Sequence, residues 1–484
     1  MASSTTIEAD VAVVGAGAAG LYAALTAAAA GGRVALVSAT PLAQSASYWA
    51  QGGLAAVLAV DDSRERHLED TLRAGRGIVR RGAAEILTNE APAAVRDLER
   101  LGVRFDADRR GRLALGLEGG HSVRRIVHAG GAATGRRITR QLSALVAEDP
   151  RIAVLEDCRA TALPTRAGRC AGVRLHDERV VCARAVVLAT GGAAALWSRT
   201  TNPAGAVGAG MMLAHAAGAA LADLEMMQFH PTAVAGLNGA DGFLVTEAVR
   251  GEGALLLDAG GERFVDELAP RDEVALAVAR RMRDTGAASV GLDMRAVDPA
   301  LFPNVVAVLR RSGLDPTREL VPVAPAAHYT MGGIATDLEG RATVPGLYAV
   351  GECACTGLHG ANRLASNSLS ECFVFGRRAA LAALAEPHPG TAPEPGSGLP
   401  RPELAQSSRE ALWRHAGIER DAEGLRMLLG DPHPLVRLVG ASALAREESR
   451  GAHLRRDFPQ REPALDEHHT VVRADEAPLL ERWA

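Results

Sequence analysis

Apolar residues in the first part of the chain come in short uncharged runs that stop at glycine. Val11 to Gly32 carries no charge and is long enough to cross a bilayer. Three glycines within it, at positions 15, 17 and 20, favour a strand, a turn and a helix instead. We expect a buried strand over Asp10–Val14, a turn over Gly15–Gly20, a helix over Leu21–Ala30 and a second strand over Arg33–Ser38. Together they form a βαβ unit.

Two later runs have the same form. "RAVVLATGG" ends at Gly191–Gly192, and "VPGLYAVGE" lies near 344–352. Runs that are apolar and then stop at glycine are expected of parallel strands whose carboxyl ends line a cofactor crevice. Their wide separation in the chain indicates that an insertion interrupts this sheet.

The pattern predicts an α/β fold with a Rossmann-like nucleotide-binding domain that is interrupted by an insertion and followed by a C-terminal helical domain. We expect the first domain over 1–222 and 330–386, with the insertion over 223–329. The Pro/Gly/Ser-rich stretch over 387–402 is interpreted as a linker. The charged stretches over 403–484, including "VRLVGASALAREESRGAHLRRDF", have helical periodicity.

Composition narrows the class of protein. The chain has 484 residues, 48% of them apolar, and its net charge of −4 gives no overall field that attracts nucleic acid or an anionic membrane. The six cysteines have no CxxC pair or metal-finger spacing, which favours free thiols over disulfides and predicts no metal site. The N-terminus "MASSTTIEAD" lacks the basic region of a signal peptide, so we expect a cytoplasmic location.

Gly15-Ala16-Gly17-Ala18-Ala19-Gly20 matches the dinucleotide fingerprint, in which glycines shape the turn and let backbone approach a pyrophosphate at a helix N-terminus. The second strand ends at Ser38, where an acidic residue would usually hold the ribose of NAD. Glu352 after "LYAVG" and a helix that begins near Ser368 and Leu369 suit a flavin instead. Ser366 and Ser368 are also ordinary candidates for N-caps.

Ten further motifs occur along the chain in the same order as in a known protein family. They are "YWAQGGLAAV", "ATGG", "TNP", "QFHPT", "TEAVRGEG", "GERF", "LAPRD", "HYTMGGI", "GLHGANRLASNS" and "ESRGAH". In this order they resemble the succinate dehydrogenase/fumarate reductase flavoprotein family over nearly the whole chain. The resemblance implies that the Rossmann-like domain binds FAD as the cofactor and that the insertion over 223–329 is a mobile α+β capping domain. It also implies hydride transfer between a dicarboxylate carbon and flavin N5.

The resemblance assigns cofactor contacts beyond the glycine turn. These are Ser38, Ala39, Ser47, Ala50, Gln51, Gly52, Gly53, Thr190, Gly191, Glu352, Ser368 and Leu369. Membrane-bound members attach FAD covalently through a histidine five residues before the glutamine of "AQGG"; here that position is Ala46, so the resemblance implies non-covalent FAD.

Within the family the chain is most similar to the branch that oxidises L-aspartate to iminoaspartate, the first step of NAD biosynthesis, with oxygen or fumarate reoxidising the flavin. Glu118 in "LEGGHS" stands where, in the dicarboxylate dehydrogenases, the residue is uncharged. A carboxylate in an otherwise cationic pocket would attract the α-ammonium that aspartate has and succinate lacks. One charge-assisted contact of about 1.5–3 kcal/mol corresponds to roughly ten- to a hundredfold preference.

The other expected site residues also come from the resemblance. Arg271 matches a proton-shuttling arginine, and Arg363 matches one that clamps a substrate carboxylate. His230 and His328, at the two ends of the insertion, match substrate-binding histidines, and Thr246 and Gln228 match lesser polar contacts. His121 and His128 are also expected to line the same pocket, without an assigned step.

Two alternatives stay open at the level of sequence. One is a soluble fumarate reductase or succinate dehydrogenase flavoprotein subunit, against which Ala46 and Glu118 argue. The other is a non-catalytic flavin-binding partner protein, motivated by departures from the family pattern such as Ala209 in place of an aspartate and Ala39 in place of a lysine. The iminoaspartate product is unstable, so the oxidase interpretation adds contact with quinolinate synthase as an expectation.

Overall fold

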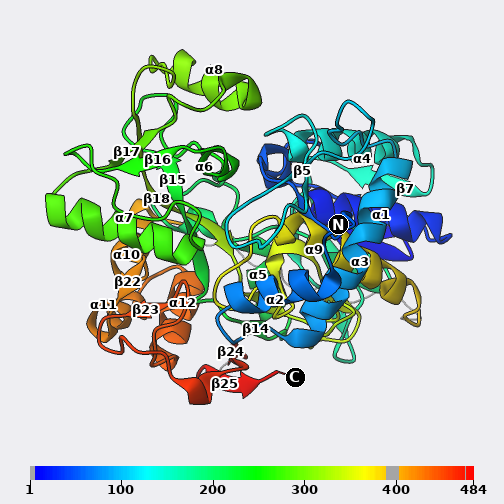
Figure 1. Ribbon diagram of the computed structural model, residues 1–484. Coiled ribbons are helices and arrows are strands. Elements are labelled where there is room, and N and C mark those ends of the chain that lie inside the picture. The colour runs from blue at the N-terminus through cyan, green and yellow to red at the C-terminus, as the bar shows by residue number, and fades with distance from the viewer. Residues whose placement is uncertain (1–5, 389–402, 475, 484) are drawn as a thin grey trace.

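The computed structural model describes residues 6–388, 403–474 and 476–483. Figure 1 shows the N-terminal and central segments on one side, the inserted segment of β15–β18 and α6–α8 on the other, and the C-terminal helices α10–α12 beside the insertion. This arrangement confirms the predicted fold class.

A five-stranded parallel sheet forms the centre of the nucleotide-binding part, in the order β20-β13-β2-β3-β7. Its strands are β2 (Val11–Val14), β3 (Val34–Val37), β7 (Ile152–Leu155), β13 (Ala185–Leu188) and β20 (Leu347–Ala349). The middle strands consist of Val, Ala and Leu that are buried on both faces, as a sheet covered on both sides requires. The three separated apolar runs therefore do meet in one sheet, as predicted.

The helices of this part are α1 (Ala18–Ala29), α2 (Arg64–Ala74), α3 (Arg81–Arg100), α4 (Thr134–Glu148), α5 (Ala209–Ala216) and α9 (Asn367–Leu384). Of these, α1, α4 and α9 pack on strands of the central sheet. α1 packs against α4 and α9, where the rings of Tyr22 and Phe373 meet edge to face at 5.2 Å. α1 begins at Ala18 rather than at the predicted Leu21, because extended Gly17 is its N-cap.

Smaller strands and turns complete this part. One mixed sheet contains β1 (Thr6–Glu8), β8 (Ala160–Ala162), β11 (Gly172–Leu175) and β12 (Val180–Cys182). A hairpin joins β9 (Thr165–Arg166) to β10 (Arg169–Cys170), and a three-stranded sheet contains β4 (Leu54–Ala55), β5 (Leu115–Gly116) and β6 (Ile126–Val127). Short 3₁₀ turns are η1 (Ala46–Trp49), η2 (Ala194–Leu196) and η4 (Gly351–Cys353).

The insertion has an antiparallel sheet and a hydrophobic core of its own. The strand order is β15-β18-β17-β16, with β15 (Met227–Val234), β16 (Leu255–Leu257), β17 (Val290–Asp293) and β18 (Val321–Thr330). Helix α7 (Arg271–Thr285) packs on β15 and β18, and α6 (Ala248–Gly251), η3 (Pro299–Leu301) and α8 (Pro303–Arg311) lie around the sheet. We call this body the cap.

The C-terminal segment is helical first and then extended. Its helices are α10 (Gln406–His415), α11 (Ala422–Leu428) and α12 (Pro434–Ala445), accompanied by β22 (Glu419–Arg420), β23 (Leu454–Arg455) and η5 (Pro463–Leu465). The helical run predicted to continue past 450 ends at Ala445. Beyond it, Arg446 and Arg450 both bind the buried carboxylate of Glu448, an arrangement that the charge pattern did not reveal.

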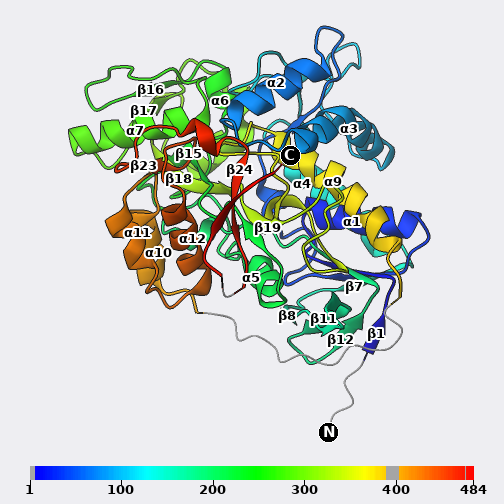
Figure 2. The same ribbon diagram turned by 90° about the horizontal axis from the view of Figure 1, so that it is seen from below.

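The chain ends in a hairpin of β24 (His468–Val472) and β25 (Leu479–Arg482), which joins β14 (Leu221–Ala222), β19 (Gly333–Ala335) and β21 (Ala354–Cys355) in one sheet (Figure 2). The expected linker falls mostly outside the described residues, at 389–402. All six cysteines are free thiols, as predicted. Among the described helices, none combines the length and the apolar character needed to traverse a membrane.

Candidate active site

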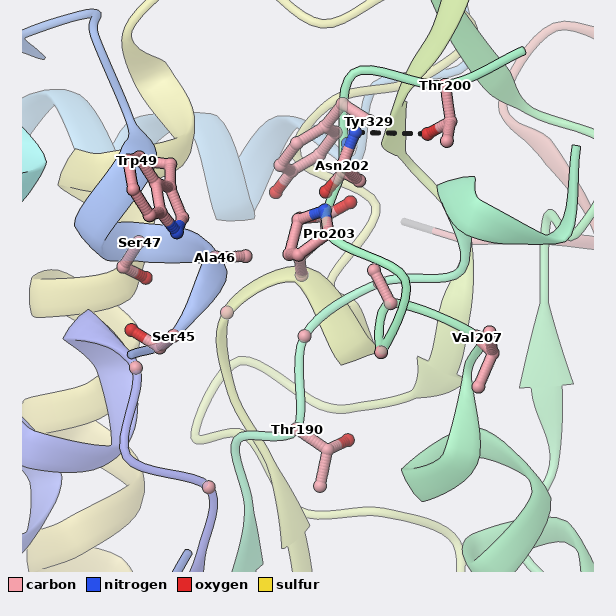
Figure 3. A pocket seen from close by; sticks show the side chains of 18 of the residues that line it. Ser45, Ala46, Ser47, Trp49, Thr190, Thr200, Asn202, Pro203, Val207 and Tyr329 are labelled. Atoms are coloured by element: carbon pink, nitrogen blue, oxygen red, sulfur yellow. Dashed lines mark hydrogen bonds between the residues drawn. The ribbon is translucent and has the colours of Figure 1, made fainter. Parts of the chain in front are cut away.

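One cavity of about 1800 Å³ extends from the carboxyl ends of the central strands to the underside of the cap. Figure 3 shows part of its wall, with Ser45, Ala46, Ser47 and Trp49 on one side and Asn202, Pro203 and Tyr329 on the other. This is the crevice position at which open α/β sheets bind ligands.

The glycine turn after β2 forms one end of the cavity. Its three glycines differ in what an added Cβ atom would contact. A Cβ on Gly15, whose φ is +112°, would lie 2.2 Å from the Ala189 carbonyl oxygen. A Cβ on Gly20 would lie 1.9 Å from the Gly15 carbonyl oxygen. A Cβ on Gly17 would meet no backbone atom within 4 Å, only the side chains of Ser47 at 3.2 Å and Ser45 at 4.0 Å. Gly15 and Gly20 therefore permit close packing, while Gly17 leaves open space at the start of α1.

The expected cofactor residues are brought together with one exception. The cavity is lined by Gly15, Ala16, Gly17, Ala18, Ala19, Ser38, Ala39, Ser47, Ala50, Gln51, Gly52, Gly53, Thr190, Gly191, Glu352, Ser368 and Leu369. Gly20 lies behind the wall, against Gly15. The sequence predicted the first turn of α1 and the loop after β3 as parts of one site, and the structure places them on one surface.

The N-terminus of α9 lies at the cavity, but its serines do not cap the helix as predicted. Ser366 is the N-cap residue in a left-handed conformation, with φ of 61°, and makes no side-chain cap hydrogen bond. Its hydroxyl donates to Glu118 instead, at 2.6 Å. The Ser368 hydroxyl accepts from Arg363 at 3.0 Å. The Asn367 amide donates to the Leu364 carbonyl oxygen at 3.3 Å, so the amides available to a ligand are those that follow it, at Ser368 and Leu369.

Glu352 lies at the same end of the cavity and is held by backbone. Its Oε1 accepts from the Thr330 amide at 3.0 Å. Burial raises the pKa of this carboxyl to about 7, against the opposing hydrogen bond from Thr330 and the charge of Arg363. A carboxyl of this kind can accept from or donate to a ligand hydroxyl.

These residues fit a flavin dinucleotide. The Ser45 hydroxyl and the Gln51 amide oxygen line the cavity, are buried, and have no hydrogen-bond partner among the described residues. A Cβ added at Gly191 would meet no atom within 4 Å. Unpaired buried polar atoms beside open backbone are expected where a polar ligand completes the wall.

The other end of the cavity lies under the cap, where the substrate residues converge. His230 on β15 and His328 on β18 face each other with ring centroids 5.0 Å apart. Burial lowers the pKa of each ring well below its ordinary value, and Arg271 lowers it further. Both imidazoles are therefore neutral and can each donate one hydrogen bond. Thr246, which is also buried, lines the same space.

Two arginines approach this space from opposite bodies, and one glutamine links them. Arg271 is the first residue of α7 in the cap, and Arg363 lies in the loop before α9. Each guanidinium donates to Gln228 Oε1, at 3.1 and 3.2 Å. Burial lowers the pKa of Arg363 to about 10, helped by the repulsion of Arg271, and the group remains charged at neutral pH. Arg363 also lies 4.6 Å above the Tyr329 ring.

Glu118 faces this cationic space as a buried carboxylate. Only 3% of the residue is exposed. Burial raises its pKa, but the facing His128 ring, the Ser366 hydroxyl and the charge of Arg271 outweigh burial and hold the pKa at about 2. The wall of this pocket therefore contains a permanent negative charge opposite two positive ones.

Glu247 is a site residue that was not predicted, although it lies in the motif "TEAVRGEG". Glu247 Oε2 accepts from Arg271 Nε at 2.5 Å, and Oε1 accepts from the Gly119 amide at 2.8 Å. The three-residue spacing from Glu247 to Arg250 was the available signal, since it puts both side chains on one face of α6. The expectation for His121 and His128 needs correction. Neither lines the cavity, and both lie in the layer behind Glu118.

Comparisons with known proteins agree with this geometry. The family described as "FAD binding domain" matches residues 10–369, and the one described as "Fumarate reductase flavoprotein C-term" matches 429–482. The L-aspartate oxidase of Caulobacter vibrioides is 47% identical over 485 aligned residues, covering 93% of this chain and 94% of the relative. That of Streptomyces coelicolor is 43% identical, covering 96% and 92%.

The chain belongs to the L-aspartate oxidase family. Its cofactor is FAD, which binds to the domain matched over residues 10–369. The same family membership implies a small-molecule substrate and an electron acceptor.

Solved structures extend the similarity to the wider fold. A FrdA variant of E. coli quinol fumarate reductase superposes with a TM-score of 0.89 at 29% identity, covering 99% of this chain and 96% of that one. Mycobacterium smegmatis Sdh1 in complex with UQ1 gives a TM-score of 0.84 at 30% identity, covering 99% and 95%. This chain thus shares its architecture with a quinol fumarate reductase subunit, so that substrate specificity has to be explained by individual residues.

Proposed function

We propose that this protein oxidises L-aspartate to iminoaspartate, the first step of NAD biosynthesis. The observation that carries the proposal is the ionised, buried Glu118 in the wall of a pocket that the guanidinium groups of Arg271 and Arg363 also line. A ligand that complements this pocket has two carboxylates and one ammonium group. L-Aspartate has this pattern of charge, whereas succinate and fumarate lack the cation.

The two carboxylates of the substrate would bind Arg363 and the pair of neutral histidines. Arg363 offers a planar fork of donors, which suits a bidentate carboxylate contact. His230 and His328 would each donate one hydrogen bond to the second carboxylate, and Thr246 adds a hydroxyl. Arg271 contributes positive charge near the reacting carbon, with its position fixed by Glu247 and Gln228.

FAD, when bound, supplies the two-electron acceptor for oxidation of the substrate's Cα–N bond. The chain's own residues orient the substrate and exclude water. With its pKa at about 2, Glu118 holds the ammonium group and does not take its proton. The cap closes over the pocket through Gln51, whose amide donates to the Leu244 carbonyl oxygen at 2.8 Å.

We also propose that FAD is bound without a covalent link. Ala46 lines the cavity at the position where covalent members of the wider family have a histidine, and a methyl group has no nucleophile (Figure 3). Acid precipitation should therefore release the whole flavin into the supernatant, and flavin that stays with the pellet would contradict this.

We further propose that oxygen or fumarate reoxidises the reduced flavin. Quinolinate synthase would be the partner enzyme that captures the imine product. Iminoaspartate hydrolyses in water, which favours direct capture. The expected signatures are aspartate-dependent hydrogen peroxide in air and aspartate-dependent consumption of fumarate without air.

Anaerobic titration of the purified holoprotein tests the main proposal. L-Aspartate should bleach the flavin absorbance near stoichiometrically, while D-aspartate and succinate should leave it oxidised. Bleaching by succinate at equal efficiency would favour a succinate dehydrogenase or fumarate reductase subunit. A flavin that none of the three reduces would favour a non-catalytic flavin-binding protein.

A further inference from the structure

Two side chains of the nucleotide-binding part, Ser366 and His128, approach the carboxylate of Glu118. The Ser366 hydroxyl donates to Oε2 at 2.6 Å, and His128 Nε2 lies 3.6 Å from Oε1. Ser366 is itself fixed, since its hydroxyl accepts from the Gly53 amide at 3.2 Å. Each carboxylate oxygen therefore has a neighbour in the protein, Ser366 in the cavity wall and His128 outside the cavity.

A glycine on the neighbouring strand leaves the space that the His128 ring occupies. Gly116 of β5 pairs with Ile126 of β6, just before His128 in the chain. A Cβ on Gly116 would lie 2.8 Å from His128 Cε1 and 3.2 Å from Nδ1. Gly116 is not among the glycines with positive φ, so that its backbone would accept alanine. The missing side chain makes room for the imidazole.

Without His128, Glu118 would have a competing partner. Arg271 acts on Glu118 electrostatically, and so does Glu118 on Arg363. A carboxylate released on one side could turn toward either guanidinium. That turn would remove the site for the ammonium group and would occupy a site for a substrate carboxylate.

We propose that His128 is a positioning residue for substrate specificity: with Gly116 behind it and Ser366 opposite, it keeps Glu118 directed at the substrate's α-ammonium group. The inference rests on the proposed oxidation of L-aspartate. It concerns recognition of the amino group, not the chemical step.

The experiment compares His128→Ala with the wild-type holoenzyme, using L-aspartate as substrate and succinate as competitive inhibitor. We expect KM for L-aspartate to rise about tenfold, the size of one charge-assisted contact. The kcat at saturation should change by less than about threefold. The inhibition constant of succinate should rise less than KM, so that the preference for the amino acid falls.

Three variants separate this role from a structural one. His128→Gln keeps an N–H donor and should recover most of the preference. Gly116→Ala displaces the ring without removing it, and should reproduce part of the His128→Ala effect. His415→Ala, on α10 of the C-terminal segment, is a control that should change neither constant.

A double-mutant cycle with Glu118→Gln decides the outcome. If His128 acts through Glu118, His128→Ala should have no further effect on the preference in the Glu118→Gln background. Additive effects, or equal losses of kcat and kcat/KM without recovery in His128→Gln, would overturn the inference. If His128→Ala does not retain flavin, Gly116→Ala and His128→Gln carry the same comparison. A wild-type protein that L-aspartate cannot reduce would instead refute the proposed function itself.

Discussion

Buried carboxylates are costly, and Glu118 lies within reach of charges that compensate it. It has a hydroxyl donor in Ser366 and positive charge from Arg271. Glu247, by contrast, is directly paired with Arg271. One carboxylate of the pocket is thus neutralised by the protein, while the other keeps its charge for a ligand. This division explains how a negative charge can improve an anion site.

The first prediction concerns Glu118 itself. Glu118→Gln keeps the shape and the hydrogen bond from Ser366 but removes the charge. We expect kcat/KM for L-aspartate to fall about ten- to a hundredfold, because one charge-assisted contact is lost. Steady-state peroxide formation measures this change.

Succinate provides the control for this variant. Because succinate has no cation, its binding should be unchanged or tighter in Glu118→Gln, as followed by perturbation of the flavin spectrum. Equal weakening of succinate and L-aspartate would mean that Glu118 supports the pocket generally rather than recognising an amine.

At this scale the sequence predicted which residues meet, but not how they are held. Glu118, Arg271 and Arg363 were predicted from separate motifs, and they do share one pocket. Their partners were not predicted. Ser366 was expected to cap α9, because serine before a helix usually does so; a left-handed backbone directs its hydroxyl to Glu118 instead. Such a conformation depends on tertiary contacts, which a one-dimensional pattern does not contain.

At the scale of elements, the turn between β2 and α1 makes a prediction about glycine. Gly20→Ala would put a methyl group against the Gly15 carbonyl, and Gly17→Ala would put one into open cavity beside Ser47. We expect Gly20→Ala to lower the free energy of unfolding of the apoprotein by about 1–3 kcal/mol through overpacking.

Gly17→Ala is the matched comparison. The apoprotein should unfold at nearly the wild-type temperature, because extended backbone accepts alanine, while flavin content after purification should fall sharply. Equal apoprotein stabilities for the two variants, measured by circular dichroism, would contradict the distinction between a packing glycine and a ligand-facing one.

Helices α2 and α9 are joined by a buried histidine that makes stability depend on pH. His67 Nε2 lies 2.8 Å from Asn367 Oδ1 at the start of α9. Burial lowers the pKa of His67 to about 3, with help from His121 and Arg125. Below pH 6.5 the unfolded chain binds a proton at this residue that the folded chain does not bind. The free energy of unfolding therefore falls by up to about 1.4 kcal/mol per pH unit, until the folded pKa is reached.

His67→Gln keeps a donor for Asn367 and removes the titration. We expect the melting temperature of this variant to fall less between pH 7 and pH 5 than that of the wild type. Comparing the two proteins isolates His67 from the other buried histidines. If the melting temperatures of both proteins depend on pH in the same way, His67 has the same protonation state in the folded and the unfolded chain, and its burial does not make stability depend on pH.

The elements themselves were largely predictable where periodicity was strong and local. The βαβ unit and the later strands were found to within a few residues, since continuous Val/Ala/Leu runs indicate buried parallel strands. The final hairpin of β24 and β25 was not predicted. "HHTVV" is short and polar at its start, and it is a strand because it pairs with β14, more than two hundred residues away.

At the scale of the whole molecule, three bodies meet at one residue. Arg76 follows α2, and its guanidinium donates to both oxygens of Asp272 at 2.9 and 3.1 Å and to Glu273 at 2.6 Å, on the first turn of α7. Its carbonyl oxygen accepts from Arg450 of the C-terminal segment at 2.6 Å. Arg271, in the active site, is the residue just before Asp272. This largely buried ion pair at the domain boundary therefore fixes the helix that begins with Arg271.

We expect Arg76→Ala to reduce kcat/KM for L-aspartate about five- to a hundredfold, because α7 loses its anchor and the Asp272 carboxylate, whose side chain is only 7% exposed, loses its partner. Hydrogen exchange of the first turn of α7 should increase in the same variant. Adding Asp272→Asn should recover part of the activity, because it removes the unpaired buried charge.

Glu419→Gln is the control. It breaks the ion pairs between the cap and the C-terminal segment at Arg280 and Arg283, both of which are more than half exposed. It should therefore change kcat/KM by less than about threefold. If Arg76→Ala behaves like this control, the boundary ion pair has no part in positioning Arg271, and other contacts, such as the hydrogen bond from Gly119 to Glu247, hold the cap in place.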